Sequence, residues 1–187
     1  QYMAAVLTYE SAARKVSDWI GYLDDCKHTQ FPDGHVGVEV KPPDINLSNT
    51  DFAVVFEDDE TVDNNHGHVR FGLRALKGAG EKAIDAIVAE REKGGAFTSL
   101  YDFCERVPLK YVNKSTIESL VNSGAFDCIH SIKDRAALVL AIDSAVNAGQ
   151  TLATDRANGQ GSLFGGSDAE VVMEKPNTTY PKLLVEN

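Results

Sequence analysis

Apolar side chains recur at helical spacing through most of the chain and alternate with polar ones only in a central part. The helical spacing predicts helices over residues 2–27, 73–77, 80–93, 97–107, 115–123 and 132–158. Short alternating or continuous apolar runs predict strands over residues 38–40, 52–56 and 68–72. We therefore expect a mainly α-helical fold with a small antiparallel β-sheet between residues 38 and 72.

Two glycines separate the second and third predicted helices, in the run Lys77-Gly78-Ala79-Gly80. Glycine allows backbone conformations that residues with a Cβ avoid, and it leaves the neighbouring N–H groups uncovered. On either side of this turn, apolar residues at helical spacing are expected to face each other: Leu73, Leu76, Ile84 and Ile87. The pattern resembles the helix-hairpin-helix motif, which binds nucleic-acid backbones without reading their sequence.

The helix that starts near Gly80 directs its free N–H groups and the positive end of its dipole at the turn, which predicts a bound phosphate. The third glycine of a dinucleotide-binding loop and the Gly-Lys-Ser/Thr of a Walker A loop are both missing. The simpler alternative is a helical hairpin that uses its glycines only to turn. The residues predicted to contact the DNA backbone are Arg74, Lys77, Gly78, Ala79, Gly80 and Lys82.

Charge is distributed unevenly along the chain, whose net charge is −10. Residues 66–115 carry nine basic and six acidic side chains, a balance of +3, whereas the remainder carries −13. The turn therefore lies in the one basic region of an acidic chain, and a local basic region can bind phosphate. No apolar run approaches the roughly 20 residues of a membrane span. Three widely spaced cysteines predict reduced core thiols, so we expect a cytoplasmic protein that does not contact a membrane.

A second candidate binding segment lies in a glycine-rich, acidic region after residue 158. An apolar Leu-Phe pair in such surroundings is poorly placed for packing in its own core, and short exposed apolar segments commonly dock into a partner's pocket. The segment resembles the clamp-binding peptide of bacterial replication proteins, Gln-x-Ser/Asp-Leu-Phe. The alternative is that the two apolar residues pack on their own domain. The residues predicted to bind a sliding clamp are Gln160, Gly161, Ser162, Leu163 and Phe164.

No set of residues in this chain indicates catalysis or a metal site. The acidic segment 57–60, with Asp63, His66 and His68 beyond it, lacks the order of calcium ligands in an EF-hand and is best interpreted as a solvated loop. No nucleophile elbow and no cysteine with an evident histidine partner is present. We therefore assign no catalytic residue, no metal ligand and no cofactor within this chain.

Taken in order, these segments resemble the bacterial replicative DNA polymerase III alpha subunit. The resemblance is carried by residues 2–8, 40–46, 69–80, 97–104, 112–114, 123–127 and 160–164. It implies a non-catalytic fragment of a DNA-directed DNA polymerase, in which the acidic residues that use Mg²⁺ belong to a palm domain before Gln1. An oligonucleotide-binding fold would follow Asn187. The implied partners are duplex DNA, a sliding clamp and other subunits of the replicative holoenzyme.

The resemblance divides the chain into four segments. Residues 1–67 would form the late fingers region with the small β element, and residues 68–130 a tandem helix-hairpin-helix module. Residues 131–158 would form a long amphipathic helix, and residues 159–187 the clamp-binding peptide with an acidic linker. Two other functions remain open from the sequence: a helix-hairpin-helix adaptor of a repair or recombination protein, and a purely structural helical module.

Overall fold

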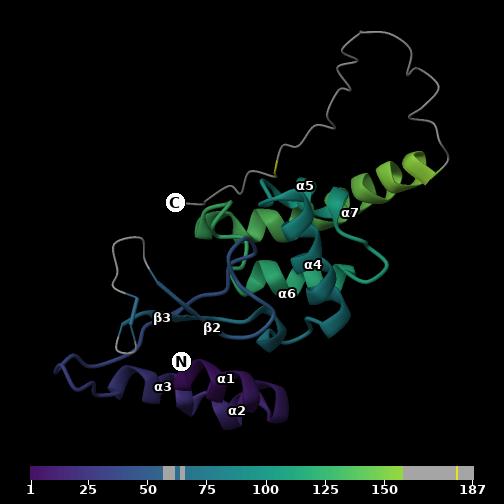
Figure 1. Cartoon of the computed structure of the whole chain (residues 1–187). Helices are drawn as coiled ribbons and strands as arrows, with labels where there is room; N and C mark the ends of the chain where they lie inside the picture. Colours follow the sequence, from purple (N-terminus) through teal and green to yellow (C-terminus); the bar gives the residue numbers. More distant parts are fainter. Residues whose placement is uncertain (57–61, 64–65, 158–179, 181–187) are drawn as a thin grey trace, which may run out of the picture.

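The computed structural model describes residues 1–56, 62–63, 66–157 and 180. Its described part is mainly α-helical and contains one small sheet, as the hydrophobic pattern predicts. Figure 1 shows three N-terminal helices beside the sheet and the remaining helices gathered on its other side. The N-terminal helices are α1 (Tyr2–Ala13), α2 (Val16–Trp19) and α3 (Gly21–His28).

Residues 2–27 are largely helical, as expected, but two breaks divide them into three helices. Arg14 is extended, with φ −131° and ψ 166°, and ends α1. A second break separates α2 from α3 at Ile20. The breaks turn Trp19 into the core, where its ring lies 6.1 Å from that of Phe52, and leave Ile20 exposed. Burial of one large aromatic side chain thus overrides the continuous helical periodicity.

The sheet contains β1 (Val40–Lys41), β2 (Ala53–Val55) and β3 (His68–Arg70) in the order β1-β3-β2. β2 and β3 are antiparallel, as expected for a hairpin. β1 instead runs parallel to β3, which makes the sheet mixed rather than wholly antiparallel. Two prolines follow β1 and prevent a direct hairpin to β2, so the chain leaves the sheet and β1 pairs with the other edge of β3.

The remaining helices enclose the larger of two apolar clusters, in which Phe97, Phe103 and Phe126 are buried. These elements are the 3-10 turn η1 (Leu73–Ala75), α4 (Glu81–Gly94), α5 (Leu100–Arg106), α6 (Lys114–Asn122), the 3-10 turn η2 (Ile132–Asp134) and α7 (Arg135–Ala157). Side-chain caps begin two of the helices. Ser99 accepts a hydrogen bond from the N–H of Asp102, and Asn113 accepts one from the N–H of Thr116.

Helix α7 confirms the long amphipathic helix expected over residues 132–158. One expectation from the sequence is corrected here, because residues 132–156 are long and apolar enough to cross a membrane by length and composition alone. The helix nevertheless buries Leu138, Ala141, Ile142 and Ala145 in the larger cluster, against α5 and α6. One face of α7 thus packs on the helical core while the rest of the helix is exposed, and no other helix in the described ranges is as long and as apolar.

The loop between β1 and β2, residues 42–52, joins the two apolar clusters. The side chain of Asn46 donates to the carbonyl of Phe97 at 2.9 Å and accepts from its N–H at 2.7 Å. On the other side of the loop, Arg91 donates to the carbonyls of Ile45 and Ser48, at 3.0 and 2.8 Å. These contacts fix the sheet and its helices relative to the helical core.

Two of the three cysteines are core thiols, as expected, and one is not. Cys26 and Cys104 are buried, whereas Cys128 is exposed. Burial raises the pKa of the Cys104 thiol to about 12, so this thiol stays protonated at neutral pH.

Candidate nucleic-acid interface

The turn between η1 and α4 is tight and depends on one glycine. The carbonyl of Leu76 accepts a hydrogen bond from the N–H of Ala79 at 3.1 Å. Gly78, the third residue of this four-residue turn, has a φ of +87°, the left-handed value that a type II turn requires at that position. Gly78 thus has the conformational role predicted for it.

Gly80 has one of the two roles predicted for it. Its φ of −70° and ψ of 144° are open to any residue, so the expectation that this glycine also needs a special conformation is wrong. A Cβ built on Gly80 meets nothing within 4 Å. The position therefore faces open space, and the absence of a side chain leaves room for another molecule to approach the backbone.

The helix expected before the turn is only the 3-10 turn η1, so the first helix of the predicted helix-hairpin-helix is shorter than expected. Long-range hydrogen bonds explain the difference. The N–H groups of Leu73 and Arg74 donate to the carbonyls of Asn49 and Thr50, at 3.0 and 2.9 Å. Leu76 is then extended, with ψ 129°, and ends the turn.

The apolar residues on either side of the turn meet in one cluster, as predicted. Leu73, Ile84 and Ile87 are fully buried, and Leu76 packs against them while remaining partly exposed. Ala79 at the tip of the turn also contacts this cluster. The turn is therefore held close to the core while its glycines stay at the surface.

Helix α6 supports the turn from the inside, through residues that the sequence did not single out. The hydroxyl of Ser119 donates to the carbonyl of Lys77. The hydroxyl of Thr116 lies 3.4 Å from the carbonyl oxygen of Gly78 and 3.3 Å from Oδ1 of Asn113, the capping residue of α6. Nothing in the sequence connects α6 with a turn almost 40 residues earlier.

The N-terminal amides of α4 are open on the outer side of the turn. Gly80 is the N-cap and no side chain accepts from the first amides of the helix. The carbonyl of Gly80 is used by the N–H groups of Ala83 and Ile84, at 3.0 and 3.1 Å. Within the described ranges, the amides of Glu81 and Lys82 have no acceptor, so they are available to an anion.

The basic residues around the turn differ in whether they form ion pairs. Lys77 and Lys82 are exposed, and neither forms an ion pair with any described residue. Arg74 instead lies 3.5 Å from Asp51, 3.3 Å from Glu81 and 3.7 Å from Asp85.

A further lysine, Lys114 at the start of α6, lies 2.6 Å from Asp143, and this hydrogen bond raises the pKa of its ammonium group. The two uncompensated positive charges near the turn are therefore those of Lys77 and Lys82. The predicted clamp-binding residues, Gln160 to Phe164, lie outside the described residues.

Comparisons with known proteins agree with this geometry. A family model described as the helix-hairpin-helix motif matches residues 37–138. The chain is 38% identical over 183 residues to DNA polymerase III subunit alpha of Pasteurella multocida, a match that covers 97% of this chain and 14% of the relative. The corresponding subunit of Haemophilus influenzae is 39% identical over 165 residues, which covers 88% of this chain and 12% of the relative.

The corresponding subunit of Deinococcus radiodurans is 39% identical over 179 residues, which covers 94% of this chain and 12% of the relative. The chain thus spans about one seventh of the length of the relatives it matches. The chain belongs to the helix-hairpin-helix family, and along nearly all of its length it is similar to a segment of DNA polymerase III subunit alpha.

Proposed function

We propose that this chain is a non-catalytic segment of a replicative DNA polymerase and binds the phosphate backbone of duplex DNA at the turn before α4. The observation that carries the proposal is the open N-terminus of α4, where free amides lie beside two unpaired lysines. The residues that would contact or surround the phosphate are Arg74, Lys77, Gly78, Ala79, Gly80 and Lys82.

These residues would contribute in different ways. The amides of Glu81 and Lys82 would donate to phosphate oxygens, and the ammonium groups of Lys77 and Lys82 would add attraction that does not depend on base sequence. Arg74 would act at the edge, since three carboxylates share its charge. Such a site fixes the position of DNA without selecting a sequence, which suits a protein that must follow any template.

The activity of the whole polymerase enters this proposal through similarity alone. Its relatives are DNA polymerase III subunits alpha, so the full protein would be a DNA-directed DNA polymerase that uses Mg²⁺ and assembles with other replicative subunits. No catalytic residue is assigned within this chain. We propose that its task is to retain DNA and the sliding clamp near a catalytic domain elsewhere in the protein.

A methyl group at Gly80 tests the phosphate site with little effect on the fold. Gly80→Ala places a Cβ in open space above the amides, where it would obstruct a phosphate. We expect duplex DNA binding, measured by fluorescence anisotropy, to weaken at least about tenfold, because charge-assisted hydrogen bonds of about 1.5–3 kcal/mol are lost. Gly21→Ala is the matched control, since its Cβ also meets nothing within 4 Å but lies in α3.

The salt dependence of binding tests the role of Lys82. Replacement by methionine removes a charge but keeps the length of the side chain. We expect Lys82→Met to weaken binding and to reduce the slope of log K against log salt by about 0.9, the value for one phosphate contact. Lys93→Met, at the other end of α4, should leave the slope unchanged. Equal slopes for all three proteins would exclude a phosphate contact at Lys82.

We also propose that Gln160, Gly161, Ser162, Leu163 and Phe164 bind the sliding clamp; sequence alone supports this part. A peptide contact of this kind keeps a polymerase beside its template, because rebinding to a tethered partner is faster than escape. Surface plasmon resonance on immobilised clamp should show binding that Leu163→Ala with Phe164→Ala abolishes. Replacement of another apolar pair in this region, Leu183→Ala with Leu184→Ala, should leave it intact. Equal loss in both variants would contradict the assignment.

A further inference from the structure

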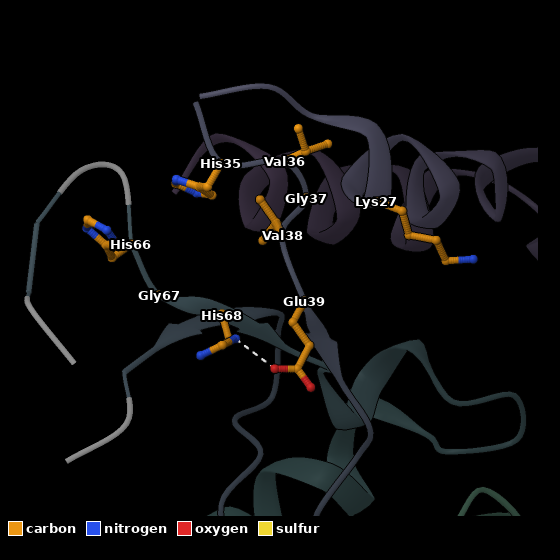
Figure 2. A pocket seen from close by; sticks show the side chains of 9 residues that line it. All are labelled: Lys27, His35, Val36, Gly37, Val38, Glu39, His66, Gly67 and His68. Atoms are coloured by element: carbon orange, nitrogen blue, oxygen red, sulfur yellow. Dashed lines mark ion pairs between the residues drawn. The ribbon is translucent and has the colours of Figure 1, made fainter. Parts of the chain in front are cut away.

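Three potential metal ligands converge beside the sheet, away from the turn described above. Asp33 and His35 come from the loop after α3, and His66 comes from the segment just before β3. One ligand atom from each residue lies within 4.8 Å of the others. The rings of His35 and His66 stack with their centroids 5.6 Å apart, and Figure 2 shows the two residues on neighbouring segments at the edge of a pocket that also includes His68 and its ion-pair partner Glu39.

The loop that carries Asp33 and His35 is held in shape by its own backbone. The carbonyl of Phe31 accepts from the N–H of Gly34 at 3.0 Å, and the N–H of Phe31 donates to the carbonyl of His35 at 3.0 Å. Gly34 has a φ of +91°, which suits a three-residue hairpin loop. The ring of Phe31 stacks on that of His35 with centroids 4.1 Å apart. Both ligands are therefore presented from a rigid turn.

A carboxylate orients His66 from the far side. Its Nδ1 lies 2.8 Å from Oδ2 of Asp63, so Nδ1–H donates to Asp63 and leaves Nε2 as the acceptor nitrogen. That Nε2 faces Oδ2 of Asp33 at 3.7 Å. A cation shared by the two atoms accounts for this approach, either a proton on the imidazole or a metal ion bound by both. A carboxylate behind the second ring nitrogen is also the usual support of a histidine that binds a metal.

We propose that Asp33, His35 and His66 bind one Zn²⁺ ion, with Asp63 as the hydrogen-bond partner that orients His66. Imidazole and carboxylate groups are the ligands that suit Zn²⁺, and three protein ligands with water complete a tetrahedral ion at a partly exposed site. Ligands on one such ion lie about 3.3 Å apart, given metal–ligand bonds of about 2.0–2.2 Å. Nδ1–H of His35 donates to Oδ1 of Asp33 at 2.6 Å, which leaves Nε2 of His35 and Oδ2 of Asp33 for an ion. Oδ2 of Asp33 lies 3.7 Å from Nε2 of His66, close to the separation of two ligands on one ion.

The ion would connect two loops that belong to different elements. It would fasten the hairpin after α3 to the beginning of β3, and so stabilise the packing of the N-terminal helices on the sheet. Mg²⁺ and Ca²⁺ do not suit the site, because both prefer oxygen ligands only. Sequence spacing could not reveal this site, since the motif is completed by a residue 31 positions after His35.

Calorimetric titration of Zn²⁺ into the 187-residue chain, without a histidine tag and after treatment with a chelator, tests the site. We expect one ion per chain. His35→Gln, His66→Gln and Asp33→Asn should each weaken binding at least about tenfold, and Asp63→Asn about 10–100-fold, as for other residues that orient a metal ligand. Co²⁺ should bind at the same site and give the intense visible absorption of a four-coordinate ion, whereas Mg²⁺ at the same concentration should give no heat.

Two control variants exclude other zinc ligands. His28→Gln removes an exposed histidine outside the cluster, and Cys128→Ser removes the exposed thiol; both should bind Zn²⁺ as the unchanged chain does. Far-UV circular dichroism checks that every variant is folded. The proposal fails if no ion binds at one equivalent, if the His66→Gln and His35→Gln variants retain full affinity, or if Cys128→Ser abolishes binding. None of these outcomes bears on DNA binding at the turn before α4.

Discussion

Tyr180 and His130 form a hydrogen-bonded pair at the start of α5. The N–H of Leu100 donates to the hydroxyl oxygen of Tyr180 at 3.3 Å, and the same hydroxyl lies 3.3 Å from Nε2 of His130. The hydroxyl accepts from Leu100 and can donate its own proton to Nε2 when the His130 ring is neutral with its proton on Nδ1. The ring of Tyr180 also packs edge-on against Tyr101, with centroids 5.8 Å apart. Tyr180 thus caps an amide of α5 and covers part of the core.

Protonation of His130 should weaken this pair. Burial lowers the pKa of His130 in the folded state, and the nearby carboxylate of Asp134 only partly opposes this. As the pH falls below the ordinary histidine pKa of about 6.5, the unfolded chain binds a proton that the folded chain resists. Stability is therefore lost from that pH down to the lowered folded pKa.

Denaturant unfolding at pH about 7.5 and about 5.5, on either side of the ordinary histidine pKa, checks this expectation. The unchanged chain should lose more unfolding free energy between the two pH values than His130→Gln, which has an acceptor oxygen but does not titrate. Tyr180→Phe should cost about 0.5–1.5 kcal/mol at the higher pH, the value of one hydrogen bond. Equal losses in the unchanged chain and His130→Gln would show that other groups set the pH dependence.

At the scale of elements, the close approach of α7 to α5 depends on Gly149. A Cβ at this position would overlap the carbonyl oxygen of Cys104, a backbone atom that cannot move aside. The higher helix propensity of alanine would stabilise α7 by about 1 kcal/mol. Overpacking, however, typically costs about 1–3 kcal/mol, and here no flexible side chain can move to relieve the overlap.

We expect the steric cost to prevail, so Gly149→Ala should lower the midpoint of thermal unfolding. Gly21→Ala is the control, because it also places alanine in a helix but meets open space. It should be neutral or slightly stabilising. A Gly149→Ala variant as stable as the unchanged chain would show that α5 and α7 can separate without loss.

The sequence could predict those elements whose structure depends only on residues that are close together in the chain. The turn at Gly78 follows from one residue's need for a positive φ, and the stripe of α7 follows from its own periodicity, so both are confirmed. The division of the N-terminal helix and the shortening of the helix before the turn have distant causes. The ring of Trp19 packs against Phe52, next to the sheet. The N–H of Leu73 donates a hydrogen bond to the carbonyl of Asn49, in a loop more than 20 residues earlier. The spacing of apolar residues along the chain reveals neither of these long-range contacts.

The candidate DNA site shows the same limit. The sequence identifies the exposed turn, because glycines and lysines occur together there. It cannot show that Arg74 is surrounded by carboxylates, or that Thr116 and Ser119 hold the turn's carbonyls. These contacts join separate elements, so they depend on the packing of the whole helical part. The support from α6 is therefore a property of the fold rather than of the motif.

At the scale of the whole molecule, Arg91 anchors the loop that runs from the larger apolar cluster to the N-terminal one. It is partly buried on α4 and donates to the carbonyls of Ile45 and Ser48 in the loop that leads to β2. Trp19, the one tryptophan in the chain, lies in the N-terminal cluster, whereas α4 to α7 supply most of the helical signal. The two parts can therefore be followed by different probes in one experiment.

Arg91→Met keeps much of the apolar stem but leaves two carbonyls without their donor, at a cost of about 1–3 kcal/mol each if both stay buried. We expect tryptophan fluorescence and far-UV circular dichroism to report one common unfolding transition for the unchanged chain. In Arg91→Met the fluorescence transition should move to lower temperature than the dichroism transition, because the N-terminal part loses its anchor to the helical core. Arg156→Met, which removes an exposed arginine from the end of α7, should leave the two transitions together. Coincident transitions in Arg91→Met would mean that Asn46 and the sheet contacts suffice to hold the two parts as one cooperative unit.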